Sequence, residues 1–153
     1  MALRQILQDG DPALRKKSRP VTKFDDRLRM LIDDMLDTMY KNNGIGLAAP
    51  QVGVLRRLFV IDLQDEKGPY VMINPRFIKQ EGTQVYSEAC LSVPGFYGDV
   101  ERPERLVVEA QDRDGKTYTM EAEELLAVCI CHEYDHLDGI LFKDKVKGAL
   151  YSQ

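Results

Sequence analysis

The chain of 153 residues is poor in the side chains that most often bind metals or form crosslinks, with two histidines and three cysteines. An odd number of cysteines argues against a disulfide framework, which pairs cysteines in secreted proteins. No apolar run approaches the roughly 20 residues that span a bilayer, and the first ten residues lack the layout of a secretory signal. We therefore expect a cytoplasmic protein that makes no membrane contact.

The chain also lacks an excess of positive charge, because its formal net charge is -4 at pH 7. A chain of this charge has no broad electrostatic attraction for nucleic acid, so no direct, sequence-specific nucleic-acid binding is expected. Hydrophobic residues make up 44% and charged residues 30%, as in ordinary globular proteins. Without repeats or a linker, residues 1–153 are expected to form one domain.

Two segments have the periodicity of helices. Apolar residues recur at helical spacing over 24–42, and a second helix is expected from about 123 to 137, with an interior stretch that is apolar on every side. β-Forming stretches occur at 57–63, at 70–73, where Asn74 and Pro75 are expected to end the strand, and at 84–86. A hairpin is predicted for 106–111 and 116–121 around Asp112–Gly115. Two unlike helices without regular βαβ alternation indicate the α+β class.

The second helix carries the pattern H-E-x-x-H at His132, Glu133 and His136. Histidines four apart project from one helix face and can bind one metal ion. Glu133 is rotated by about 100° from His132, which suits a general base that reaches a metal-bound water. The alternative is a helix that carries two satisfied histidines by chance. Two unpaired rings in a buried helix would be costly, whereas one metal satisfies both.

A catalytic site of this type usually has three protein ligands. Downstream of His136 the only carboxylates are Asp138, which is poorly aimed at the helix end, and Asp144, so the third ligand is sought upstream. Cys90 is the best upstream candidate, because a thiolate is stabilised by a nearby metal. The alternative for Cys90 is a small buried core residue.

A third segment, Gly44–Gln51, contains two glycines that let the backbone approach a ligand closely. It is no phosphate-binding loop, because the Gly-Lys-Ser/Thr ending is absent. The alternative is a plain turn between a helix and a loop. Gln51 could supply an amide donor to a developing oxyanion.

Together these segments resemble the three signature motifs of peptide deformylases. Gly44–Gln51 matches G-x-G-L-A-A-x-Q, Glu88–Ser92 matches E-G-C-L-S, and His132–Leu137 matches H-E-x-D-H-L. The chain departs from the family at Ala89, which replaces a glycine, and at Cys131, which often is a glutamine. If position 89 needs a positive φ, its alanine costs about 1 kcal/mol.

The resemblance implies antiparallel sheets packed around the central helix that carries the two histidines. It implies a metal-dependent hydrolase that removes the formyl group from the N-terminal formylmethionine of nascent polypeptides and releases formate. Cys90, His132 and His136 would bind one divalent metal together with water. Fe²⁺ is expected, with Zn²⁺ and Ni²⁺ as alternatives, because sulfur and imidazole ligands accept all three.

By the same resemblance, Glu133 is the general base, and the Gln51 side chain and the Leu91 N–H stabilise the oxyanion. The substrate-binding residues would be Ile45, Gly46, Tyr86, Glu88, Leu125, Val128 and Cys129. Val128 and Cys129 also suit a plain core, and Glu88 is expected to pair with Arg102. The alternative function is a metallopeptidase that cuts internal peptide bonds, and a closed structural site would need four ligands.

The expected partners are N-formylmethionyl peptides and the ribosome near its exit tunnel. The chain ends soon after Phe142. The C-terminal helix that some relatives use for ribosome docking is therefore expected to be shortened or missing.

Overall fold

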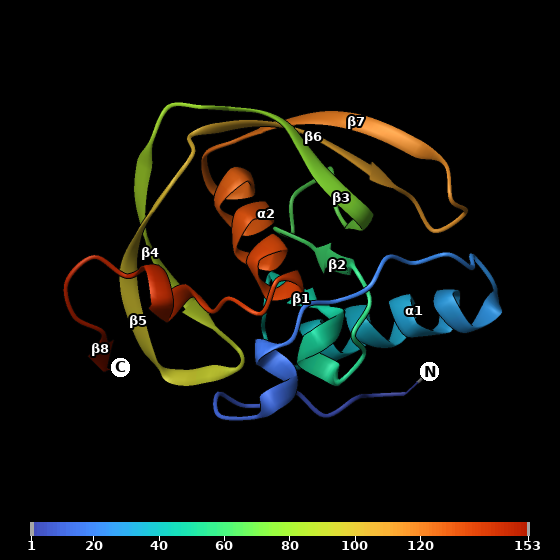
Figure 1. The fold of residues 1–153 in the computed structure, drawn as a ribbon, viewed down its shortest axis with the longest axis horizontal. Coiled ribbons are helices and arrows are strands. Elements are labelled where there is room, and N and C mark those ends of the chain that lie inside the picture. The colour runs from blue at the N-terminus through green and yellow to red at the C-terminus, as the bar shows by residue number, and fades with distance from the viewer. Residues whose placement is uncertain (1, 153) are drawn as a thin grey trace.

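The computed structural model describes residues 2–152. Helix α2 packs at its centre and is surrounded by antiparallel strands (Figure 1). One sheet has the order β1-β2-β3-β6-β7 and the other β4-β5-β8, and all of these pairings are antiparallel. In chain order the elements are η1 (Pro12–Arg15), α1 (Asp26–Lys41), β1 (Gly46–Ala48), η2 (Ala49–Val52), β2 (Leu58–Ile61), β3 (Tyr70–Glu81), β4 (Gln84–Cys90), β5 (Val93–Arg102), β6 (Arg105–Gln111), β7 (Thr117–Glu123), α2 (Glu124–Leu137), η3 (Phe142–Lys145) and β8 (Tyr151–Ser152). The predicted α+β class, with antiparallel sheets around a central helix, is confirmed.

Helix α1 forms where the apolar periodicity predicted a helix, within two residues at each end. The Asp25 carboxylate caps its start by accepting the Leu28 N–H at 3.1 Å, which satisfies one of the free donors of the first turn. Its buried face, which includes Ile32 and Met35, packs toward β1 and β2. This packing holds the C-terminal end of α1 beside the segment that starts at Gly44.

Strand β2 is buried on both faces, which explains its unbroken apolar run. Leu58 and Val60 belong to the cluster that α1 covers, whereas Phe59 and Ile61 belong to the cluster around α2. The alternation follows from the two-residue period of a strand. Strand β2 therefore separates the two helices and fixes the depth at which α2 lies.

Strand β3 is longer than predicted, because it continues to Glu81 rather than ending at Asn74 and Pro75. Its pairing with β6 shifts between Ile73 and Arg76, and Asn74 has a φ of 50°. The Asn74 side chain accepts the Val21 N–H at 2.8 Å and donates to the Val21 carbonyl at 2.9 Å. A bulge tolerates a proline without an N–H, so the predicted strand end was wrong.

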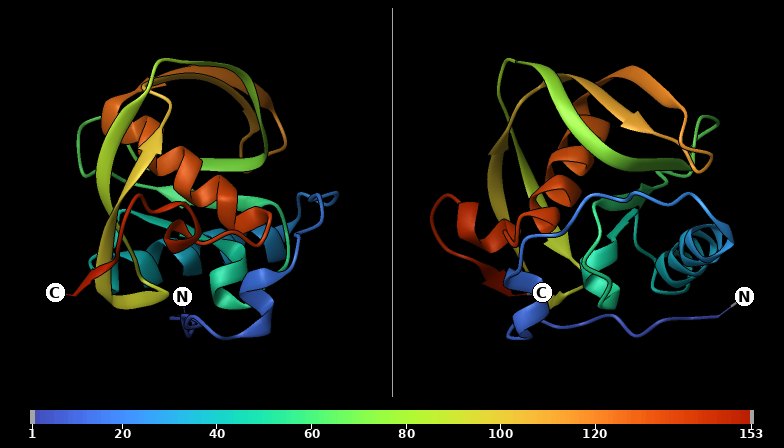
Figure 2. Two further views of the ribbon diagram at one scale, coloured as in Figure 1. Left: turned by 60° about the vertical axis from the view of Figure 1, so that its left-hand side comes forward. Right: turned by 45° about the vertical axis from the view of Figure 1, so that its right-hand side comes forward.

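The predicted hairpin is confirmed as β6 and β7, joined by a turn in which Gly115 has a φ of 84°. Strands β4 and β5 cross beside α2, on its opposite side from α1 (Figure 2). This arrangement brings the end of β4 close to the C-terminal half of α2. Within the described residues, none of the helices is sufficiently long and apolar to traverse a membrane.

Candidate metal centre

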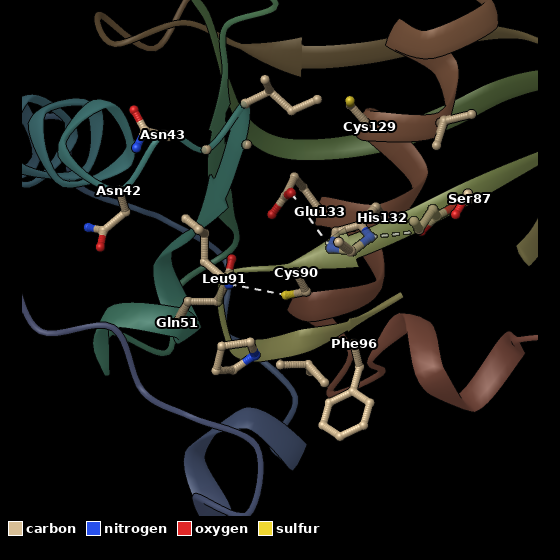
Figure 3. A pocket seen from close by; sticks show the side chains of 18 of the residues that line it. Asn42, Asn43, Gln51, Ser87, Cys90, Leu91, Phe96, Cys129, His132 and Glu133 are labelled. Atoms are coloured by element: carbon tan, nitrogen blue, oxygen red, sulfur yellow. Dashed lines mark hydrogen bonds and ion pairs between the residues drawn. The ribbon is translucent and has the colours of Figure 1, made fainter. Parts of the chain in front are cut away.

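The side chains of Cys90, His132 and His136 converge between the end of β4 and helix α2. Figure 3 shows Cys90 and His132 beside each other at this point. One ligand atom from each residue lies within 4.8 Å of the others, and the Cys90 Sγ is 3.4 Å from His136 Nε2. The two imidazole rings lie one turn apart on α2, with centroids 5.1 Å from each other. Cys90 reaches them because β4 ends at a pairing irregularity with β5, between Glu88 and Cys90.

A buried ion-pair network orients His132. Its Nδ1–H donates to the Glu88 carboxylate at 2.8 Å, and Arg102 donates two bonds to Glu88 at 2.8 and 2.9 Å. Because Nδ1 is engaged by Glu88, Nε2 is the ring nitrogen that can bind a metal. The expected pairing of Glu88 with Arg102 is present. Arg102 also donates to Asp135 at 2.7 Å, a contact that the sequence reasoning missed although Asp135 lies inside the H-E-x-D-H-L motif.

The electrostatics of the two histidines fit a bound cation. Burial alone lowers the pKa of His132, but its hydrogen bonds with Cys90 and Glu88 outweigh burial and raise that pKa well above its usual value. Burial, and then the charge of His132, hold the pKa of His136 well below its usual value. The surroundings therefore favour one positive charge near His132 and a neutral ring at His136. A metal on the two rings and the sulfur supplies that charge, and this donor set suits a transition metal with one further coordination position.

Glu133 is placed as a proton acceptor at the edge of this cluster. Its Oε2 is 4.0 Å from His132 Nε2, and its buried Oε1 has no hydrogen-bond partner among the described residues. Burial raises the pKa of Glu133 to about 7, against the opposing effect of His132. A Cβ at Gly46 would lie 2.5 Å from Glu133 Oε2, so a glycine at position 46 makes room for the carboxylate.

Gln51 presents its amide nitrogen to the cysteine segment. The side chain is buried in η2, and its Nε2 donates to the Ser92 hydroxyl at 3.0 Å and to Cys90 Sγ at 3.5 Å. Its Oε1 accepts the Ala48 N–H at 2.9 Å, which fixes which end of the amide faces the site. The sequence reasoning did not identify Ser92, whose hydroxyl holds the amide and became recognisable only through this contact.

A pocket of about 730 Å³ opens beside the cluster. Its lining contains Gln51, Cys90, Leu91, His132 and Glu133, whereas His136 lies behind them, 1% exposed. All seven residues predicted to bind substrate also line it: Ile45, Gly46, Tyr86, Glu88, Leu125, Val128 and Cys129. Sequence reasoning missed further lining residues that carry no motif, among them Gln8, Asn42, Asn43 and Phe96.

Three of the predicted pocket residues have a second structural role. Val128 and Cys129 are 2% and 6% exposed, so each belongs to the interior and to the pocket wall at once. Burial raises the pKa of the Cys129 thiol to about 12, which keeps this wall uncharged. The carboxylate of Glu88 is engaged by Arg102 and His132, so Glu88 reaches the pocket while it orients a histidine.

The two departures from the family motifs leave the cluster intact. Ala89 lies within β4 and outside the positive-φ region, so its methyl group causes none of the left-handed strain considered above. Cys131 is buried in the core around α2. Burial raises the pKa of its thiol to about 12, so Cys131 is a neutral core residue.

Comparisons with known proteins agree over nearly the whole chain. The family model described as polypeptide deformylase matches residues 3–150. The peptide deformylase of Acetivibrio thermocellus is 58% identical over 146 residues, which cover 95% of this chain and 85% of that protein. The peptide deformylase of Caldicellulosiruptor bescii is 59% identical over 146 residues, which cover 95% of this chain and 87% of that protein.

Solved structures show the same similarity. The crystal structure of peptide deformylase from Thermotoga maritima has a TM-score of 0.94 and 41% identity, and the match covers 97% of this chain and all of that one. The complex of a peptide deformylase from Synechococcus elongatus with actinonin has a TM-score of 0.90 and 47% identity, covering 94% of this chain and 79% of that chain. Matching motifs, fold and sequence show that this chain belongs to the peptide deformylase family.

Proposed function

We propose that this chain hydrolyses the formyl group of N-terminal formylmethionine at a metal held by Cys90, His132 and His136. The observation that supports this proposal most directly is that these three ligand atoms lie within 4.8 Å of one another. A carboxylate with one oxygen that has no partner in the described part of the chain lies beside them, at the end of a largely apolar pocket. The H-E-x-x-H metallopeptidase alternative accounts for the helix but not for the cysteine or the Gln51 segment.

When bound, the metal supplies Lewis acidity that polarises the formyl carbonyl and makes a water molecule acidic near neutral pH. Glu133 accepts a proton from that water while the water oxygen bonds to the formyl carbon. Negative charge then grows on the carbonyl oxygen, where the Gln51 Nε2–H and the Leu91 N–H donate. When the C–N bond breaks, Glu133 passes the proton to the leaving nitrogen. Formate and a free methionine amine result.

The pocket accounts for the preference for methionine. Ile45, Leu125, Val128 and Cys129 give it walls without charge, and such walls suit a flexible thioether side chain. Tyr86 is 42% exposed and lies toward solvent, whereas Gly46 lines the pocket beside Glu133. Glu88 acts from behind this wall by holding His132 in one tautomer.

We propose Fe²⁺ as the resident metal, with Zn²⁺ and Ni²⁺ as alternatives that the same donors accept. The substrates are the formylated ends of nascent chains. The reaction therefore takes place in the cytoplasm, near the ribosomal exit tunnel. Residues 1–153 form the single catalytic domain that carries it out. If the metal is Fe²⁺, air inactivates the enzyme by oxidising the iron and Cys90.

The test is formate release from formyl-Met-Ala by protein purified without oxygen, with metal analysis of the same sample. We expect about one metal per chain and turnover that disappears in Glu133→Gln while the metal content stays the same. Cleavage of internal bonds in an unformylated peptide, without formate release, would contradict the proposal and favour the metallopeptidase. Loading the protein with Ni²⁺ or Zn²⁺ and exposing each form to air tests the choice of iron.

A further inference from the structure

The N-terminal segment Leu7–Asp9 contacts both segments that carry the oxyanion donors. The Leu7 N–H donates to the Gln51 carbonyl at 2.7 Å, and the Asp9 N–H donates to the Ser92 carbonyl at 2.7 Å. These two short bonds join parts of the chain that are 41 residues apart, at positions 51 and 92.

The geometry of an extended chain explains why one segment can hold both loops. Backbone N–H groups of residues i and i+2 point to the same side of an extended strand. Leu7 and Asp9 stand two residues apart, and each donates to one of the two loops. Between them, the Gln8 side chain reaches the pocket rim and donates through Nε2 to the Leu91 carbonyl at 3.5 Å.

The segment is itself anchored at its C-terminal end. It continues into a turn in which the Asp11 N–H donates to the Gln8 carbonyl at 3.0 Å, with Gly10 at a φ of 105°. The Asp9 carboxylate forms an ion pair with Lys143 of η3. Phe142, which directly precedes Lys143, stacks on the His132 ring with the ring centroids 6.0 Å apart. The segment is thus connected to the far side of the metal centre as well.

We propose that Leu7–Asp9 is a positioning clamp that holds the Gln51 amide and the Leu91 N–H at the separation needed for the oxyanion. This inference rests on the proposed function and deepens it. Donors stabilise a transition state best when they are already in place, because no reorganisation is then needed as charge develops. The Gln51–Ser92 side-chain bond ties the two loops on the inner side, and the clamp ties them through their backbones.

Asp9→Pro removes one clamp donor and leaves the turn intact. Asp9 occupies the second position of the Gln8–Asp11 turn, and the positive φ of Gly10 at the third position is that of a type II turn. Proline is favoured at the second position of this turn type. Asp9→Ala is the matched control, because it also loses the ion pair with Lys143 but keeps the N–H.

We expect Asp9→Pro to lower kcat for formyl-Met-Ala by about tenfold relative to Asp9→Ala, below the ~100-fold loss that a 1 Å misplacement causes. KM and metal content should stay within about twofold, because the donors act in the transition state and not on the bound peptide. Leu7→Pro against Leu7→Ala repeats the comparison at the Gln51 end, should Asp9→Pro fail to fold. Equal kcat within either pair would overturn the clamp.

Hydrogen exchange of the metal-free protein separates this inference from the proposed function. Peptides that cover residues 88–96 should exchange faster in Asp9→Pro than in Asp9→Ala, whereas the β7 peptide, which the clamp does not touch, should be unchanged. Unaltered exchange at 88–96 would refute the clamp even in an active enzyme. Faster exchange in Asp9→Pro than in Asp9→Ala, together with a wild-type protein that releases no formate, would refute the proposed function and leave the clamp standing.

Discussion

Replacing Gly46 by alanine tests whether the position of Glu133 controls turnover. The new Cβ would lie 2.5 Å from Glu133 Oε2, about 0.9 Å less than the 3.4 Å at which ordinary van der Waals contact begins. The Cδ and Cγ atoms of Glu133 lie only 3.0 and 3.1 Å from the same point, so the whole end of the side chain has to move. Gly46 is not in the positive-φ region, so the backbone tolerates alanine there.

A displacement of the base by nearly 1 Å is expected to lower kcat by about 100-fold, which is ~2.7 kcal/mol in the activation free energy. The three atoms nearest the new methyl group all belong to Glu133 and none to a metal ligand, so the metal content should equal that of the wild type. Overpacking of this kind also costs about 1–3 kcal/mol of folding stability. Steady-state formate release, metal analysis and urea unfolding on the same samples measure the three quantities.

A double-mutant cycle with Glu133→Asp separates displacement of the base from a general disturbance. The aspartate is one methylene shorter and withdraws from the methyl group, so Gly46→Ala should cost at least ~1 kcal/mol less in the Glu133→Asp background. The reasoning would be refuted by a metal-loaded Gly46→Ala enzyme within about threefold of the wild-type kcat, or ~0.7 kcal/mol. Strict additivity of the two changes would refute it as well.

Three further perturbations probe the ligands, the buried network and the N-terminal anchor. Cys90→Ser should weaken metal binding by more than about tenfold and lower activity in proportion, measured by dialysis against buffered metal, because an alcohol replaces the thiolate; unchanged metal content would place the third ligand elsewhere. Arg102→Met should lower the free energy of unfolding by about 3–5 kcal/mol in urea titrations, because it removes the buried guanidinium that Glu88 and Asp135 share; a loss below ~1 kcal/mol would show that the network contributes little. Hydrogen bonds from the Ala2 N–H, and then from Arg4, lower the pKa of Asp34 below its model-peptide value of 3.8. A carboxyl group whose pKa is lower in the folded than in the unfolded protein stabilises the fold while it is ionised, and this contribution is lost as the pH falls. The stability difference between wild type and Asp34→Asn should therefore shrink below pH 3.8, and a pH-independent difference would contradict this account.

The elements that the sequence predicted well are those whose signals are local. The spacing of His132 and His136 depends only on the helical repeat, which holds within any helix that forms. The β-strand within 57–63 and the β6–β7 hairpin were likewise encoded in short runs of residues. Where a local rule failed, at Asn74, the reason was a distant partner, because the Val21 backbone and the bulge opposite β6 keep the strand going.

By itself, the sequence determined which residue types were available for the reaction and on which face of a helix two of them project. Only the tertiary structure decided that the Cys90 sulfur reaches those rings, that Gly46 leaves space for Glu133, and that Arg102 joins Glu88 to Asp135. The physical reason is range. Backbone geometry fixes relations across a few residues, whereas contacts between residues far apart in sequence depend on how the sheets and helices pack around their shared cores.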